Sequence, residues 1–196
     1  MDAWKQTIAR IREVKMELAR VNPEAGPVVA PPSGAALRAI STVERRICRR
    51  LPPSYRAFLH EHDGWPLFFE GASLLGTREL SKPGYAEATR AAFAAYETPI
   101  PEVGPPSRPT GSAEAMIPFG MDPRGSTIFA FNPAVVAADG EMEVILWVNE
   151  LGDRTENFGD FLSMVLEMLT IDVAEHDRRR AEGSGESHKS LLKKSA

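Results

Sequence analysis

The sequence lacks the cysteine pairs, the long apolar runs and the signal peptide that mark secreted and membrane proteins. Cys48 is the one cysteine among 196 residues, which excludes an internal disulfide and a cysteine-based metal cluster. We expect this side chain to pack as a small apolar residue rather than to act as a nucleophile. No apolar run approaches the ~20 residues of a membrane-spanning helix, and the N-terminal segment is charged throughout, without the apolar centre of a signal peptide. The sequence therefore predicts a cytoplasmic protein without a membrane partner.

The common motifs of catalysis and cofactor binding are also missing. The glycines form neither a G-x-x-x-x-G-K-[S/T] phosphate loop nor a G-x-G-x-x-G turn, and there is no G-x-S-x-G elbow. His60 and His62 lie two positions apart, which turns them to different sides of a helix, so a core histidine is favoured over a metal ligand at position 62. Asp122 is interpreted as a turn aspartate rather than a catalytic acid. We expect no catalytic residue, no cofactor and no metal site, with a small hydrolase of unrecognised site as an alternative.

Charge is distributed unevenly along the chain. The net charge is −4, but residues 1–96 sum to +4, residues 97–175 to −11 and residues 176–196 to +3. An acidic surface repels nucleic acid and attracts basic proteins at a rate that falls with salt. The alternative is a surface that only keeps the protein hydrated, and charge alone does not decide between the two.

Arginines gather near the end of a helix predicted at about residues 35–50. The apolar stripe of this helix consists of four residues: Leu37, Ile40, Val43 and Ile47. Four arginines occupy its last part: Arg45, Arg46, Arg49 and Arg50. Cations at this end suit the helix dipole. A nucleic-acid patch is the alternative, but interleaved aromatic residues are missing, so we expect no nucleic-acid partner.

The best-defined helix of the sequence lies within residues 51–64. Pro52 and Pro53 fit a first helical turn, where the missing N–H would be unbonded anyway. Apolar and aromatic residues then recur on one face, at Tyr55, Phe58, Leu59 and His62. Asp63-Gly64 ends the helix, because glycine takes up the left-handed conformation that closes one. Together with the aromatic run that follows, this face is predicted to form the core.

Short strands and a closing helix are predicted after this point. The strands are expected at residues 65–69, 73–75, 117–120, 126–131 and 143–148. Asn132-Pro133 is expected to break the fourth strand, and the fifth is apolar on both faces and therefore central. Residues 149–157 are predicted to form a polar loop and residues 158–171 the last helix. Since the links at 120–126 and 132–142 are too short for helical crossovers, the fold class is α+β with a mostly antiparallel sheet.

Three segments are distinguished along the chain. Residues 1–34 combine a helix at 2–21, whose apolar stripe packs on the body or docks on a partner, with a Pro-rich linker. Residues 35–174 form the folded domain. An insertion at 81–115 interrupts it, with an alanine-rich helix at 85–97 and a proline-rich surface excursion. Residues 175–196 are a charged tail, expected to extend the last helix and then to be disordered.

Three motifs follow one another in the folded domain. The first is leucine-proline, an aromatic, a Phe-Leu pair and Asp-Gly: Leu51, Pro52, Tyr55, Phe58, Leu59, Asp63 and Gly64. The second comprises Ile117, Pro118, Gly120, Asp122 and Gly125, and the third Phe158, Phe161 and Leu162. This order resembles the SUKH superfamily of Smi/Knr-like domains over about residues 35–170. The resemblance implies an α+β domain with a mostly antiparallel sheet and without catalytic or cofactor-binding residues.

The resemblance also implies a function. Bacterial domains of this superfamily are mostly immunity proteins that bind and block a cognate toxin, so we expect a non-enzymatic binding protein whose partner is a basic protein toxin. The candidate partner-binding residues are the acids around the strand at 143–148: Asp139, Glu141, Glu143, Glu150, Asp153 and Glu156. A cation is the alternative ligand, but their spacing matches no Ca²⁺ loop. Fungal relatives act in regulation, so a regulatory or scaffold module that docks through the helix at 2–21 stays open, as does the oligomeric state.

Overall fold

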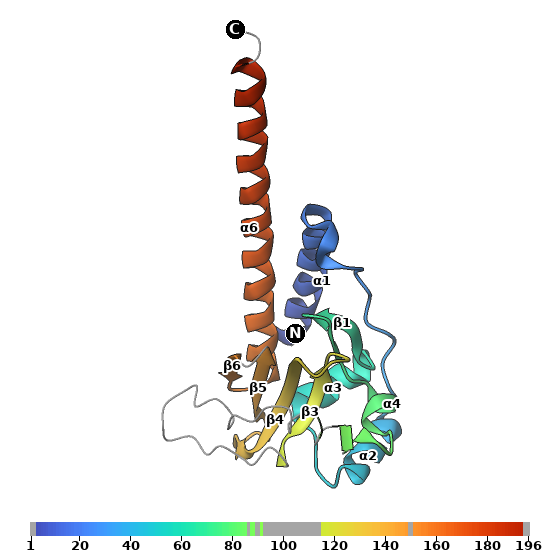
Figure 1. Cartoon of the computed structure of the whole chain (residues 1–196). Coiled ribbons are helices and arrows are strands. Elements are labelled where there is room, and N and C mark those ends of the chain that lie inside the picture. The colour runs from blue at the N-terminus through green and yellow to red at the C-terminus, as the bar shows by residue number, and fades with distance from the viewer. Residues whose placement is uncertain (1–2, 86, 89–90, 92–114, 149–150, 194–196) are drawn as a thin grey trace. The chain divides into compact units, whose positions relative to one another are not determined.

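A six-stranded antiparallel sheet confirms the predicted α+β class (Figure 1). Its strands lie side by side in chain order. They are β1 (Trp65–Phe69), β2 (Ala72–Leu74), β3 (Ile117–Met121), β4 (Thr127–Val136), β5 (Met142–Val148) and β6 (Leu151–Thr155). Each pair of neighbours is antiparallel, as the short links between β3, β4 and β5 require.

The computed structural model describes residues 3–85, 87–88, 91, 115–148 and 151–193. Most of the predicted helix at 85–97 and all but the end of the excursion at 98–115 lie outside these residues. By its contacts the chain divides into two units, Val29–Phe161, called the body here, and Met1–Val28 together with Leu162–Ala196. Each unit is described by itself.

Two strand predictions were wrong. Asn132-Pro133 does not end β4, which continues to Val136 because the register with β5 shifts between Asn132 and Val136. A proline is tolerated in a strand at such a bulge, where no ladder hydrogen bond is required of it. The predicted loop at 149–157 contains the edge strand β6, which pairs with β5 from Val144–Thr155 to Val148–Leu151. An edge strand has a partner on one side only and needs no apolar alternation.

Helix α3 (Pro53–Glu61) begins at the predicted prolines, and its face is fully buried at Tyr55, Phe58 and Leu59. Gly64 follows with φ +89°, and a Cβ there would come within 2.7 Å of backbone atoms of Leu74 and Gly76. Only glycine fits such a position. The predicted helix end is therefore confirmed.

Asp63, beside that glycine, holds the next helix in place. Its carboxylate accepts hydrogen bonds from the backbone amide of Thr77 at 2.5 Å and from the Thr77 hydroxyl at 2.9 Å. Thr77 is the first residue of α4 (Thr77–Leu80), so the carboxylate satisfies an amide at a helix start that has no partner within the helix.

Helix α2 (Leu37–Arg46) is shorter than predicted and buries only part of its expected stripe. Ile40 and Val43 are buried, whereas Leu37 is 59% exposed. Leu37 is the first helical residue, and the apolar face of α2 packs against the rest of the body only from Ile40 onward.

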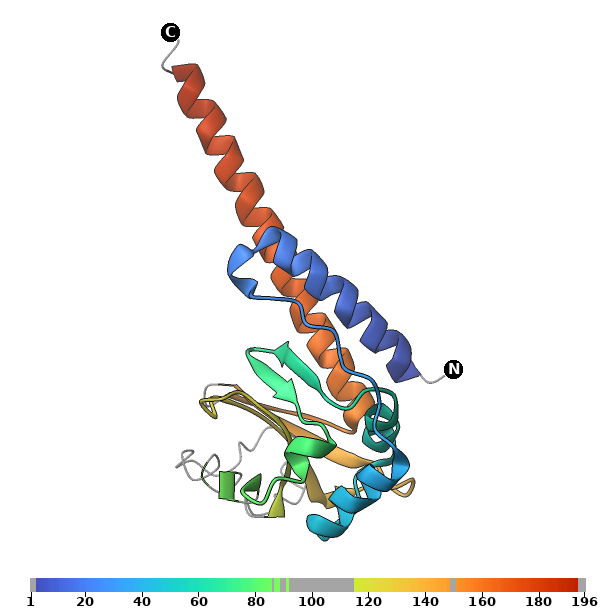
Figure 2. The same cartoon turned by 90° about the vertical axis from the view of Figure 1, so that its right-hand side faces the viewer.

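The core of the body is a cluster of aromatic rings from α3, the first turn of α6 and one face of the sheet. Figure 2 shows the ribbons of the body from the side. Phe119 of β3 stacks on Phe131 of β4 with ring centroids 4.1 Å apart. The ring centroid of Tyr55 lies 5.1 Å from that of Phe119, and the ring centroid of Phe129 lies 5.0 Å from that of Phe161. These rings come from distant parts of the chain, so they hold the helices and the sheet together.

The opposite face of β4 and β5 is also apolar. Ile128, Ala130, Ile145 and Trp147 form a buried cluster with Met116. β5 is thus buried on both faces, as predicted, but it is next to the edge of the sheet rather than at its centre.

The second unit consists of helices and a short 3-10 turn. Helix α1 (Ala3–Val21) confirms the predicted helix at 2–21 and is followed by η1 (Pro23–Ala25). The stripe of α1 is buried at Ile8, Ile11 and Val14. Helix α6 (Phe158–Lys193) begins in the body, includes the predicted helix at 158–171 and continues into the charged tail, which was expected to extend it.

Candidate functional site

The structure separates the six acidic candidates into different environments. Asp139, Asp153 and Glu156 are exposed, Glu141 is half-buried and Glu143 is buried, while Glu150 lies outside the described residues. The six residues therefore do not form one acidic surface.

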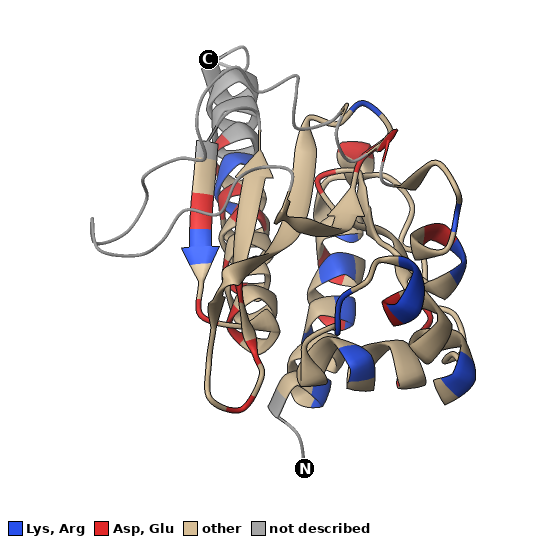
Figure 3. Cartoon of the chain, turned by 90° about the horizontal axis from the view of Figure 1, so that it is seen from below, with Lys and Arg blue, Asp and Glu red and all other residues tan. Residues whose placement is uncertain are grey.

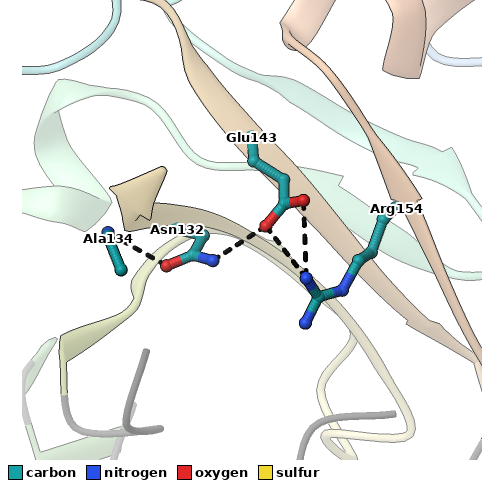
Figure 4. A network of polar contacts seen from close by, with 4 residues as sticks. All are labelled: Asn132, Ala134, Glu143 and Arg154. Atoms are coloured by element: carbon teal, nitrogen blue, oxygen red, sulfur yellow. Dashed lines mark hydrogen bonds and ion pairs between the residues drawn. The ribbon is translucent and has the colours of Figure 1, made fainter. Parts of the chain in front are cut away.

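Glu143 is part of a buried polar network on the second face of the sheet (Figure 4). Its side chain is 0% exposed and lies 3.4 Å from the guanidinium of Arg154, which is 7% exposed. The Asn132 amide donates a hydrogen bond to the same carboxylate at 2.8 Å, and its oxygen accepts one from the amide of Ala134 at 3.0 Å. Glu143 thus compensates a buried cation and offers no surface to a partner.

Glu141 is engaged at the start of α3. Its carboxylate accepts hydrogen bonds from the backbone amide of Ser54 at 2.8 Å and from the Ser54 hydroxyl at 2.6 Å. An anion near a helix N-terminus satisfies a free amide and opposes the positive end of the helix dipole. Glu141 ties the β4–β5 turn to α3, which is a structural role.

The three exposed acids lie along one margin of the body, which we call the acidic edge (Asp139, Asp153 and Glu156). Asp139 is in the β4–β5 turn and its carboxylate accepts a hydrogen bond from the amide of Glu141 at 3.1 Å. β6 is the edge strand, and Asp153 lies on it opposite Leu146 of β5. Glu156 follows Thr155, whose partner is Val144, so the antiparallel register brings Glu156 to the end of β5 at which the β4–β5 turn lies.

The acidic edge combines exposed carboxylates with the unpaired backbone of an edge strand. The Cα atoms of Asp153 and Glu156 are about 10 Å apart in an extended chain, and strand alternation turns the two side chains to opposite sides. Carboxylates that are separated in this way suit several separate basic side chains of a protein partner better than one small cation. In the part of the chain that the structure describes, no three His, Cys, Asp or Glu residues are close enough to hold a metal ion.

Asp122 has the turn role that its position after Gly120 predicts. Its carboxylate accepts hydrogen bonds from the amides of Arg124 at 3.0 Å and Thr127 at 2.8 Å, and from the Ser126 hydroxyl at 3.1 Å. Burial by itself raises the pKa of Asp122, but these hydrogen bonds outweigh it and leave the pKa below its usual value. The ionised carboxylate of Asp122 thus stabilises the β3–β4 turn.

His60 and His62 make contacts within the body, whereas Cys48 is exposed. His60 lies with Nδ1 3.1 Å from the carbonyl oxygen of Ala35, and the ring of His62 is 5.9 Å from that of Phe58. The prediction that Cys48 packs as an apolar residue was wrong, because the side chain is exposed just after the end of α2, at φ +52°.

Sequence reasoning missed Arg154 as the partner of Glu143. A signal was present, since strand alternation puts Glu143 on the same face as Ile145 and Trp147, and a carboxylate on a buried face needs a cation or donors. The partner comes from β6, the strand that the sequence did not reveal.

Comparison with known proteins adds one match. The model of the SMI1 / KNR4 family (SUKH-1) matches residues 34–164, about two thirds of the chain. No curated protein matches the chain. Within the described residues, no helix is both long and apolar enough to cross a membrane.

Proposed function

The chain belongs to the SMI1 / KNR4 family (SUKH-1), and from this premise we propose that it is a cytoplasmic, non-enzymatic immunity protein that binds a basic bacterial toxin and neutralises it. The observation that carries the proposal is the acidic edge, which presents Asp139, Asp153 and Glu156 on a body of this family. Glu150 lies outside the described residues and is therefore not placed on this surface. Glu141 and Glu143 are not included, because α3 and Arg154 engage them.

Charge complementarity supports a basic partner. Rim carboxylates raise the association rate through long-range attraction, and this contribution falls as salt screens it. Basic side chains that approach the edge strand meet separate carboxylates and the outer backbone groups of β6. The proposal therefore predicts binding that weakens with salt.

The experiment begins with capture of the partner. A tagged copy of the full chain is purified from its native cell at low salt and at about 0.5 M salt, where the screening length is about 4 Å. The captured protein is identified, expressed alone to measure its toxicity, and then co-expressed with the chain. We expect a basic protein that is held less well at high salt, is toxic alone and is harmless together with the chain.

A charge-reversed variant tests the surface. In Asp139→Lys/Asp153→Lys/Glu156→Lys we expect loss of protection and binding weakened about tenfold or more, from three exposed ion pairs of up to about 1 kcal/mol each. The matched control reverses three exposed acids elsewhere, Glu24, Glu70 and Glu87, and should protect like the unmodified chain. A captured partner that is harmless when expressed alone contradicts the immunity function. Equal binding by the two variants rejects the acidic edge as the interface.

A regulatory module that docks through α1 is the second candidate from the sequence. Docking would use the apolar stripe of α1, but Ile8, Ile11 and Val14 are 6%, 0% and 2% exposed. A stripe covered by the chain itself has little apolar surface left for a partner, so this observation favours the toxin-binding function.

A further inference from the structure

A basic groove lies on the body between α2 and α4. It has a volume of about 770 Å³, and its lining includes three arginines, Arg38, Arg45 and Arg78, with no Asp or Glu among the residues that the structure describes. Ser41, Thr42 and Ser81 add hydroxyl groups to the same lining. The short helices of the body carry several of the basic positions visible in Figure 3. We call this feature the basic groove.

The positions of its residues follow from the two helices. Arg38 and Arg45 are seven residues apart on α2, which places them two turns and about 10 Å apart on one face. Arg45 donates a hydrogen bond to the Thr42 hydroxyl at 2.9 Å, and that hydroxyl donates to the carbonyl of Arg38 at 2.8 Å. Arg46 donates to the carbonyl of Ser81, just after α4. One hydrogen bond thus joins the two walls, while the other two order the arginines along α2.

The charge of the groove is not neutralised by the described part of the chain. None of the three groove arginines forms an ion pair there. The nearby acids are engaged elsewhere: Glu44 pairs with Arg56, Asp63 caps α4, and Glu79 lies 4.0 Å from Lys82. Three like charges around one concave surface repel one another and favour an anion that enters between them.

We propose that the basic groove is a second binding surface, distinct from the acidic edge, and that it holds an acidic, extended segment of a protein partner. Carboxylates of residues i and i+2 on an extended strand lie about 7 Å apart and those of i and i+4 about 13 Å, which brackets the spacing of Arg38 and Arg45. Each guanidinium can hold one carboxylate through two parallel hydrogen bonds. The hydroxyls of Ser41 and Ser81 line the same groove and can bind the peptide backbone of such a segment.

Other anionic ligands fit the groove less well. A single phosphate ion occupies one position, whereas the arginines of the groove are spread over two turns of α2 and over α4. Single-stranded nucleic acid binds through aromatic stacking platforms, and the lining of the groove has no aromatic residue. A lipid surface is flat and broad, whereas this surface is concave. An acidic peptide satisfies the length, the charge and the hydroxyls together.

The test measures peptide binding directly on the full chain. A fluorescein-labelled ten-residue peptide of alternating Glu and Ser is titrated by fluorescence anisotropy, and the Lys/Ser peptide serves as its charge control. We expect the Glu/Ser peptide to bind, the Lys/Ser peptide not to, and Arg38→Glu/Arg45→Glu/Arg78→Glu to weaken binding about tenfold or more, from three exposed charge-assisted contacts. The triple Arg→Lys variant keeps the charge but loses the paired hydrogen bonds, and we expect an intermediate loss.

The matched control is Arg12→Glu/Arg49→Glu/Arg50→Glu, which changes the net charge equally at exposed arginines outside the lining. It should bind the peptide within about twofold of the unmodified chain, and thermal melts establish that both variants fold. Equal loss in the two variants would mean that the peptide senses only net charge, which rejects the groove. Failure to bind the Glu/Ser peptide also rejects the proposal. Binding of inorganic phosphate, a dT oligonucleotide or phosphatidylglycerol vesicles that depends on the groove arginines, without binding of the peptide, rejects it as well. Because this assay needs no toxin, its result is independent of the acidic edge.

Discussion

Removal of the Glu143 carboxylate tests whether this acid is a structural group or part of a binding surface. Glu143→Gln keeps the size of the side chain and part of its hydrogen bonding but removes the charge opposite Arg154. The guanidinium is 7% exposed, and its Nε has no hydrogen-bond partner in the described structure. The variant leaves this buried cation without its counter-charge.

The expected cost is large for a single conservative substitution. Breaking a buried ion pair from one side typically costs about 3–5 kcal/mol, because the remaining charge has lost its water and its partner. For a chain of this length, 1 kcal/mol corresponds to about 2–4 °C in Tm. We therefore expect Glu143→Gln to lower the Tm by about 6–20 °C.

A double-mutant cycle separates the pair from its surroundings. Glu143→Leu alone and Arg154→Met alone each leave one buried charge without its partner and should each cost a similar amount, whereas Glu143→Leu/Arg154→Met places two apolar side chains on an apolar face. Such replacements are often neutral or stabilising, so the double variant should be more stable than either single variant. Urea unfolding followed by circular dichroism gives the free energies of unfolding.

Asp153→Asn is the matched control, because this carboxylate is exposed on the strand that carries Arg154. It should change the free energy of unfolding by less than about 0.5 kcal/mol. If Glu143→Gln costs no more than this control, or if the double variant loses as much as the two single variants together, Glu143 and Arg154 are not a buried ion pair and the structural reasoning is refuted.

Three further predictions concern groups with a defined hydrogen-bonding role, each measured by thermal or urea unfolding. Glu141→Gln weakens the contact with Ser54 at the start of α3 and should lower the free energy of unfolding by about 1 kcal/mol. An unchanged free energy of unfolding would mean that Glu141 has no structural role there. Tyr55→Phe removes the donor to the carbonyl of Leu75 at 2.6 Å and should cost about 1–2 kcal/mol. Since burial raises the pKa of Tyr55 well above its usual value, the unmodified chain should lose stability as pH rises above about 10, and the Phe variant should lack this contribution. Because the pKa of Asp122 is lowered, its contribution to the free energy of unfolding is present above pH 4 and disappears as pH falls below about 4. Asp122→Asn should be less stable at pH 7, and its stability should fall less between pH 7 and low pH. An unchanged fall in stability at low pH would contradict this assignment.

The elements that the sequence predicted well are those with a strong apolar period. Tyr55, Phe58 and Leu59 recur at helical spacing, and their burial follows directly from the need to cover that face. Phe129 and Phe131 alternate along β4 for the corresponding reason in a strand. Because these residues supply the core, the α+β class could be predicted before the structure was known.

The elements that it missed are governed by pairing rather than by pattern. β6 has the sequence LGDRT, which shows no alternation, and it exists because β5 offers a free edge. Pro133 is accommodated by a bulge whose register depends on the partner strand. Leu37 is exposed because it is the first residue of its helix, a boundary that apolar spacing does not define.

The candidate site was harder to predict, because net charge does not distinguish surface acids from structural ones. The sum of −11 over residues 97–175 includes Asp122 in a turn, Glu141 at a helix start and Glu143 in an ion pair. These carboxylates are engaged within the same chain, so the sum overstates the number of acids that can contact a partner.

The opposite holds for the arginines of α2 and α4. They lie in a segment whose charge sums to only +4 over residues 1–96, yet Arg38, Arg45 and Arg78 line a groove without an acid. What decides the sign of a surface is therefore which charges remain uncompensated after folding, and this depends on tertiary contacts that the sequence alone does not show. On this reasoning, the body presents two charged surfaces of opposite sign, and added salt should weaken the binding of a basic partner and of an acidic peptide alike. Only the charge-reversed variants, each paired with its matched control, assign a given salt effect to one surface or the other.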